Sequence, residues 1–408
     1  MKRIRNILFV LIALSAVLVT MTSCGGSKKE VEKTSLLIYI AGNNTLSSMA
    51  PDCMNQLRSG FIPSDSLDSD ILMVYYHIPG QNPRLIKMTR NSRGLIRETT
   101  LCTYPSDQKS ASVTTLSQVI MDAENLCPAK YHNLVLWSHS TGFLPEETYD
   151  KLYYNKDLQA KPEKDASVPA PTARSPRKSF GKDYDSAEEI ELVDLADALP
   201  FKYESIIFDS CLMGGVEVAY QLKDKCKYLA VSPTEIMAQG FPYYMMLDEL
   251  FNNPDKEAAI INIAREYFEY YNRQPGQGGT VAVVKTSEIE PLATVCKSIF
   301  SRHSAEIFAI DRERVQYFDR CTAHWLYDLG DIVLKVGSTS EYLEFSKALD
   351  AAVIYKASTP TFLNIKINKY SGLGMYLPDP EYRFLNYYYQ KLAWNKTTGL
   401  VNSNYFLK

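Results

Sequence analysis

The sequence predicts an α/β fold in which a mostly parallel central sheet is covered by helices on both faces. Six short, nearly continuous apolar runs carry this prediction, because strands that are buried on both faces read in this way. The stretches between several of these runs have apolar residues at helical spacing. The runs are SLLIYIAGNN (35–44), SDILMVYYHI (69–78), HNLVLWSHS (132–140), ESIIFDSC (204–211), YLAVSPTE (228–235) and GTVAVVKT (279–286).

Helices are expected between and after these runs. In MAPDCMNQL, Met49, Cys53 and Leu57 fall on one helical face, and the apolar positions of residues 116–127 fit a period of 3.6. Residues 256–274, 287–303 and 319–333 also read as helical. We interpret residues 35–275 as a core domain and residues 276–408 as a part that completes the sheet and adds an accessory subdomain.

The N-terminus has the pattern of an export signal. Three basic residues, Lys2, Arg3 and Arg5, precede an apolar stretch from 7 to 19, and MTSC then ends at Cys24. This pattern resembles the lipobox of bacterial lipoproteins, in which the cysteine is lipidated. We therefore expect a signal peptide over 1–23, a lipid-attached tether over 24–34, and an exported lipoprotein of the cell envelope, at the outer membrane or cell surface. The alternative is an ordinary secreted protein.

Composition excludes some classes of function. The formal net charge is −3, and about −6 without the three basic residues of the signal. The basic residues are scattered or lie in one linker, so no nucleic-acid partner is indicated. Seven cysteines follow Cys24, an odd number whose spacings match neither a zinc site nor a dense disulfide scaffold. No metal site is predicted from these spacings.

Residues 151–182 interrupt the alternating pattern. This segment has eight Lys or Arg, four Pro and few large apolar residues, so it is too poor in apolar surface to order itself. It separates the third apolar run from the fourth. We interpret it as a flexible processing loop, with Arg174, Arg177 and Lys178 as candidate cleavage positions; the alternative is a passive surface insertion.

The third and fourth runs each end in a residue with catalytic chemistry, His139 and Cys211. If the two strands are parallel neighbours, both side chains emerge at the same edge of the sheet. The expected helix LMGGVEVAYQL would place Cys211 at a helix N-terminus, which favours a thiolate. His139 could then act as base and acid. Taken singly, either residue has a structural alternative, as a strand-end histidine or a core cysteine.

The motifs LWSHSTGF (136–143) and FDSCLMGGVEVAYQL (208–222) resemble those of clostripain-like cysteine peptidases, which belong to the caspase-like clan. YSGLGMYLP (370–378) extends the resemblance over most of the chain after the signal. It implies a caspase-like three-layer sandwich and a catalytic dyad of His139 and Cys211. It also implies an oxyanion hole made by the backbone N–H groups of Ser140 and Cys211.

The resemblance further implies that Asp209 lies in the S1 pocket, where a carboxylate selects Arg or Lys at P1. Glu235 is the nearest candidate for a second acidic residue of that pocket. No cofactor is required by the sequence, although calcium is possible by the family resemblance. Two positions depart from the family pattern: Ser140 stands where Gly is usual, and Asn43 stands where Asp is common.

These observations predict a lipid-anchored cysteine endopeptidase that cleaves after Arg or Lys and is activated by self-cleavage in the 151–182 loop. Its partners would be peptide substrates and, through Cys24, a membrane. The alternative is a weakly active or inactive surface lipoprotein that uses the scaffold for binding, with Ser140 as the mark of lost activity.

Overall fold

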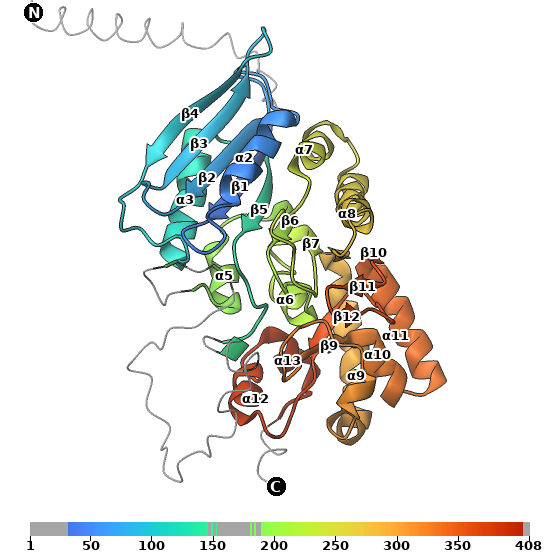
Figure 1. Cartoon of the computed structure of the whole chain (residues 1–408). Helices are drawn as coiled ribbons and strands as arrows, with labels where there is room; N and C mark the ends of the chain where they lie inside the picture. The colour runs from blue at the N-terminus through green and yellow to red at the C-terminus, as the bar shows by residue number, and fades with distance from the viewer. Residues whose placement is uncertain are drawn as a thin grey trace, which may run out of the picture. The chain divides into compact units, whose positions relative to one another are not determined.

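The centre of the protein is a nine-stranded sheet in the order β10-β8-β7-β6-β5-β1-β2-β3-β4 (Figure 1). The computed structural model describes residues 32–145, 148–149, 152, 180–181, 183–184 and 189–402. The strands of the sheet are β1 (Thr34–Ala41), β2 (Ile71–His77), β3 (Arg84–Arg90), β4 (Ile96–Thr103), β5 (Tyr131–Trp137), β6 (Tyr203–Asp209), β7 (Cys226–Val231), β8 (Thr280–Lys285) and β10 (Val353–Ser358).

The five middle strands, β7, β6, β5, β1 and β2, run parallel to one another. Two antiparallel strands extend the sheet at each edge: β3 and β4 beyond β2, and β8 and β10 beyond β7. All six predicted strands are present. Strands β3, β4 and β10 were not predicted, because charged and polar residues keep each of them from forming a continuous apolar run.

Helices cover both faces of the sheet, as predicted. One core is formed with α2 (Ala50–Ser59), α7 (Tyr243–Asn252) and α8 (Lys256–Asn272). The other face packs against α3 (Val113–Leu126), α5 (Leu192–Ala198), α6 (Val216–Gln221) and α9 (Ile289–Phe308). β1 and β2 are buried along their whole length, which is why they read as unbroken apolar runs.

The C-terminal region belongs to the same compact unit, which begins at Lys33. It adds β9 (Leu326–Asp328), α10 (Leu329–Val336), α11 (Thr339–Ala352), the hairpin β11–β12 (Thr361–Phe362 and Ile365–Lys366), β13 (Gly374–Tyr376), α12 (Arg383–Tyr389) and α13 (Ala393–Thr398), with short 3-10 turns at Thr286–Glu288 and Arg312–Arg314. The prediction of a helix over 319–333 is wrong for residues 319–328, because α10 begins only at Leu329. The carboxylate of Asp319 accepts the backbone N–H groups of Cys321, Trp325 and Leu326, which holds a turn there and leads into β9.

Within the described residues no helix combines the length and apolar character needed to cross a membrane. The predicted signal over 1–23, Cys24 and the candidate cleavage positions Arg174, Arg177 and Lys178 lie outside the described residues.

Candidate active site

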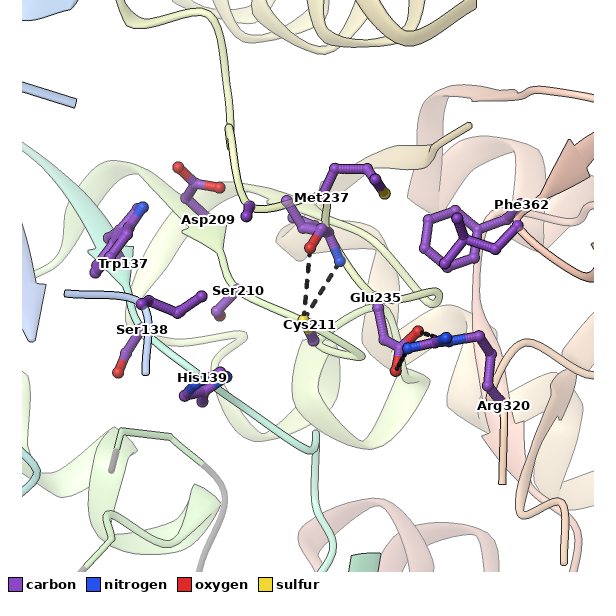
Figure 2. Close-up of a pocket in the computed structure, with 14 residues that line it drawn as sticks. Trp137, Ser138, His139, Asp209, Ser210, Cys211, Glu235, Met237, Arg320 and Phe362 are labelled. Carbon is purple, nitrogen blue, oxygen red and sulfur yellow. Dashed lines mark hydrogen bonds and ion pairs between the residues drawn. The ribbon is translucent and has the colours of Figure 1, made fainter. Parts of the chain in front are cut away.

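His139 and Cys211 follow the ends of two neighbouring parallel strands. In the register of β5 and β6, Trp137 is opposite Asp209. His139 and Cys211 therefore each lie two positions after this residue pair. The prediction that these strands are parallel neighbours is confirmed. His139 and Cys211 line one cavity of about 340 Å³, together with Asp209 and Glu235 (Figure 2).

The turns that follow the two strands pack directly against each other. Gly142 has a φ of +67°, and a Cβ there would lie 2.7 Å from the carbonyl oxygen of Leu212, so this position requires glycine. The Ser140 hydroxyl donates a hydrogen bond to the carbonyl of Cys211. In the described part of the chain only Leu212 and Leu363 combine a side chain with a positive φ. Ser140 therefore keeps an ordinary backbone conformation and adds a bond that glycine could not make.

Cys211 does not stand at a helix N-terminus, contrary to the prediction. Helix α6 begins at Val216, because the backbone before it pairs with the segment after β7. Leu212 N donates to Thr234 O at 3.0 Å and Gly214 N donates to Ser232 O at 2.8 Å. The intervening turn separates the thiol from the helix, so the helix dipole does not favour a thiolate.

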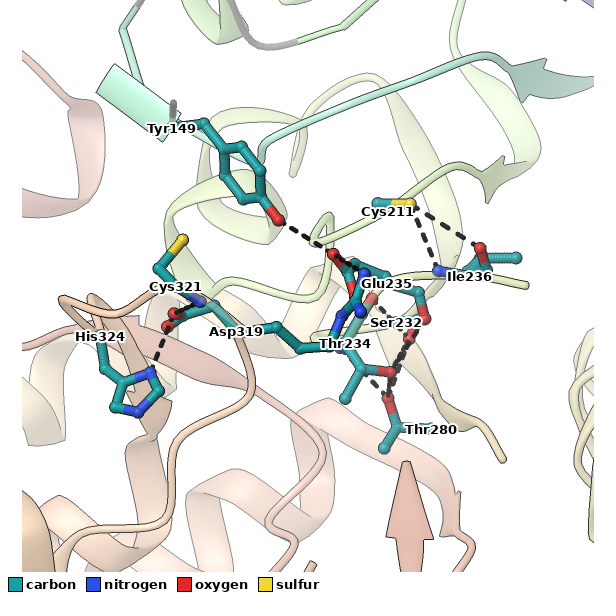
Figure 3. A network of polar contacts seen from close by, with 11 residues as sticks. Tyr149, Cys211, Ser232, Thr234, Glu235, Ile236, Thr280, Asp319, Cys321 and His324 are labelled. Carbon is teal, nitrogen blue, oxygen red and sulfur yellow. Dashed lines mark hydrogen bonds and ion pairs between the residues drawn. The ribbon is translucent and has the colours of Figure 1, made fainter. Parts of the chain in front are cut away.

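The thiol of Cys211 lies against the backbone of Ile236. Ile236 N donates to Sγ at 3.4 Å, and Sγ lies 3.8 Å from Ile236 O (Figure 3). Burial raises the pKa of the thiol to about 12, although the Ile236 N–H opposes this. At neutral pH the resting thiol is therefore protonated, and its proton must pass to a base when the sulfur attacks.

A hydroxyl cluster fixes the segment that carries Ile236. Ser232 Oγ and Thr234 Oγ1 lie 2.8 and 2.9 Å from Thr280 Oγ1, at the start of β8 (Figure 3). All three side chains are buried. The cavity wall facing Cys211 is thus tied to the sheet.

The ring of His139 is positioned from the loop after β1. Thr45 Oγ1 lies 2.8 Å from His139 Nε2. The loop is held by Asn44, whose amide donates to Ala41 O at 2.9 Å and to Ser138 Oγ at 3.3 Å. Asn44 therefore organises the strand end beside the histidine.

Asp209 lies at the buried end of the cavity, and its side chain is only 4% exposed. Its Oδ2 accepts hydrogen bonds from Tyr243 Oη at 2.6 Å and Phe241 N at 3.3 Å. A Cβ on Gly240, which has a φ of +68°, would lie 2.3 Å from the same oxygen. Burial raises the pKa of Asp209 to about 6 despite these bonds, so the carboxylate is mostly ionised above that pH.

Glu235 is held by two partners. Arg320 contacts both of its carboxylate oxygens, with Nη2 at 3.1 Å from Oε1. Tyr149 Oη donates to Oε1 at 2.9 Å (Figure 3). The predicted S1 role of Glu235 stays a prediction, because in this arrangement its charge is paired within the protein.

Both sides of the predicted processing loop are attached near the cavity. Tyr149 precedes the loop and binds Glu235. At its other end Gly181 N donates to His139 O at 2.9 Å, and Phe180 forms a backbone bridge with Ser140. The carboxylate of Asp183 accepts Ala111 N at 3.0 Å. Phe180, two positions after Lys178, is thus anchored beside His139.

Among the described residues no group of three or more His, Cys, Asp or Glu side chains is arranged to hold a metal ion. Calcium, which the family resemblance left possible, has no such cluster in that part of the chain.

The site residues that sequence reasoning missed include Thr45, Tyr243, Arg320 and Leu363. Thr45 follows a predicted strand end and could have been included on that ground. The other three lie in loops or helices without a motif, and nothing in their local pattern points to the cavity.

Comparison with known proteins identifies the family. The model of the clostripain family matches residues 170–403. The chain belongs to the clostripain family of cysteine proteases. It is 32% identical to an inactive zymogen C11 protease from Parabacteroides distasonis, over 90% of this chain and 98% of that chain, with a TM-score of 0.75.

A second solved clostripain-family structure shares the fold. It is a secreted C11 cysteine protease from Bacteroides thetaiotaomicron in complex with an irreversible peptide inhibitor, 23% identical over 90% of this chain and 99% of that chain, with a TM-score of 0.73. No curated protein matches the chain. These matches and the three-layer architecture confirm the caspase-like fold.

Proposed function

We propose that this clostripain-family protein is a lipid-anchored endopeptidase that cleaves after Arg or Lys, with Cys211 as nucleophile and His139 as acid and base. The observation that carries the proposal is the matched register of β5 and β6, which brings the two side chains to one cavity. The ordinary backbone of Ser140 supports activity over the alternative of a non-catalytic binding protein.

In the proposed reaction the thiol proton of Cys211 passes to His139 as the sulfur attacks the scissile carbonyl carbon. The carbonyl oxygen becomes an oxyanion, for which we assign the backbone N–H groups of Ser140 and Cys211 as donors. The C–N bond then breaks while His139 gives its proton to the leaving amine. Water, deprotonated by His139, attacks the thioester, and the C–S bond breaks as the sulfur is protonated.

The proposed P1 preference rests on Asp209. Its carboxylate lines the cavity two residues before Cys211. Both of its hydrogen bonds within the described protein end on Oδ2, which leaves Oδ1 for a substrate cation. A buried carboxylate interacts strongly with a guanidinium or ammonium because little water screens the pair. Arg or Lys at P1 therefore fits this end of the cavity.

Processing after Arg174, Arg177 or Lys178 would join this specificity to activation. The attachments of Tyr149 to Glu235 and of Gly181 to His139 connect both ends of the loop to the cavity. A cut between them would let the two attachments move independently. The zymogen state of one solved relative supports this idea.

The test uses the mature protein and reporter peptides that differ only at P1: Arg, Lys or a neutral residue. We expect hydrolysis of the Arg and Lys peptides by the wild type and none by Cys211→Ala or His139→Ala, with folding checked by circular dichroism. Near-wild-type activity in His139→Ala would show that the dyad is assigned wrongly.

Processing is read on the same preparations. The wild type should run as two fragments on denaturing gels and as one species in size exclusion, because the fragments share one sheet. Cys211→Ala alone should stay intact and be cut when active enzyme is added. A fully active wild type that remains one intact chain would refute required processing.

A further inference from the structure

The hairpin β11–β12 brings an apolar side chain to the rim of the cavity. Leu363, at its tip, is 39% exposed and lines the cavity that contains Cys211. Phe362, which precedes it, is fully buried and lines the same cavity. Leu363 therefore presents apolar surface at the cavity rim, against which a ligand side chain can pack.

The backbone of Leu363 is strained. Its φ is +49°, in the left-handed region where glycine or asparagine is usual and a branched side chain is disfavoured. Strain of this kind persists where the surroundings fix it, and it clusters at ligand sites. The strained backbone of Leu363 therefore supports a role in ligand binding independently of the exposure of its side chain.

The hairpin base is rigidly attached to the sheet. Thr359 N donates to Gly279 O at 3.0 Å, and Thr359 Oγ1 donates to Thr361 O at 2.7 Å. A Cβ on Gly278 would lie 2.2 Å from Thr361 O, so the two backbones are in close contact. These contacts hold Leu363 at the cavity rim.

The position of the hairpin decides which part of a substrate it meets. Figure 2 shows His139 and Phe362 on opposite sides of Cys211. In the proposed reaction His139 protonates the leaving amine, so residues after the scissile bond lie on its side. The P1 side chain is directed to Asp209. The residue before P1 accordingly falls on the side of Phe362.

Met237 also lines this cavity. We propose that Leu363, together with Phe362 and Met237, forms a subsite for a large apolar side chain at P2, the residue before P1. The inference rests on the proposed peptidase function. Glu235 and Arg320, which line the same side of the cavity, pair with each other. Because these two charges are paired with each other, they do not favour a charged side chain at P2.

The test compares two peptides with the same basic P1 residue and either Leu or Gly at P2. We expect kcat/KM to favour Leu by about tenfold, the low end of what an apolar contact gives in an enzyme pocket. Leu363→Gly suits the left-handed backbone and removes only the side chain, so this ratio should fall close to one. Leu67→Gly is the matched control, since Leu67 is 89% exposed and outside the cavity; it should keep the wild-type ratio.

A second measurement separates failure of the subsite from failure of the peptidase function. Binding of the same two peptides is measured on the Cys211→Ala background, with and without Leu363→Gly. Tighter binding of the Leu peptide that is lost in Leu363→Gly supports the subsite even if no peptide is cut. A Leu-to-Gly ratio of one in the wild type, or one that Leu363→Gly leaves unchanged, would overturn the subsite while Cys211-dependent cleavage after Arg or Lys still stands.

Discussion

Replacing Asp209 by Asn tests the source of specificity, because it keeps the shape of the side chain and removes its charge. Losing a buried charge partner costs about 2–5 kcal/mol. At about 1.4 kcal/mol for each factor of ten, kcat/KM for Arg and Lys peptides should fall by about 30-fold to about 4000-fold. A peptide with a neutral P1 residue has no charge to pair and should lose much less.

The same substitution should not destabilise the protein. Burial raises the pKa of Asp209 from 3.8 to about 6, so the folded protein disfavours the ionised form. The stability that protonated Asp209 contributes is present below about pH 4 and is lost as pH rises through about 6. A shift of about two units corresponds to about 3 kcal/mol. At about pH 7.5 the neutral Asn avoids this cost, so Tm should equal or exceed that of the wild type.

The assay is the ratio of kcat/KM for the Arg peptide to that for the neutral peptide, measured against pH. In the wild type this ratio should rise through about pH 6 as Asp209 ionises, whereas in Asp209→Asn it should be low and flat. Taking the ratio removes any titration of His139 that acts on both peptides alike. Equal losses for both peptides, or a lower Tm with loss of all activity, would show that Asp209 serves the fold and not the pocket.

Three further predictions concern other parts of the chain. Cys24→Ala should abolish lipidation and detergent-phase partitioning, and mass spectrometry that finds an unmodified N-terminus at another residue in the wild type would contradict the anchor. Burial raises the pKa of Glu217 to about 7, and its Oε1 accepts hydrogen bonds from Tyr376 N and Tyr389 Oη. Wild-type stability in urea should therefore fall as pH rises from about 5 to about 7, and Glu217→Gln should make this fall smaller while the contribution of Asp209 remains. Thr45→Ala should lower kcat about tenfold with little change in KM, because the His139 ring loses its partner, and Thr45→Ser should restore it; an unchanged kcat would remove Thr45 from the site.

The strand ends were the predictable part of the site. His139 and Cys211 each follow an apolar run, and parallel strands leave their carboxyl ends at one edge. The thiol environment was not predictable in the same way. The apolar pattern of LMGGVEVAYQL fits a helix from residue 212, but pairing of Leu212 and Gly214 with the 232–234 segment delays the helix to Val216. Tertiary hydrogen bonds outweighed the local pattern there.

The partners of the site residues come from distant parts of the chain. Thr45 is 94 residues from His139, Tyr243 is 34 from Asp209, and Arg320 is 85 from Glu235. None of these separations leaves a local signature, since each contact exists only after the sheet has brought the loops together. The same holds for Leu363, whose significance depends on a hairpin tip reaching the cavity.

The most direct test of the proposed catalytic dyad identifies the reacting atom. The mature protein is treated with a peptide that carries Lys at P1 and an electrophilic ketone in place of the scissile bond, and the modified residue is located by mass spectrometry. Seven cysteines beyond Cys24 compete for the reagent. We predict modification of Cys211 alone, much slower modification in His139→Ala, and slower modification when P1 is neutral. Modification of another cysteine, or of Cys211 at a rate that neither His139→Ala nor the P1 residue changes, would contradict this prediction.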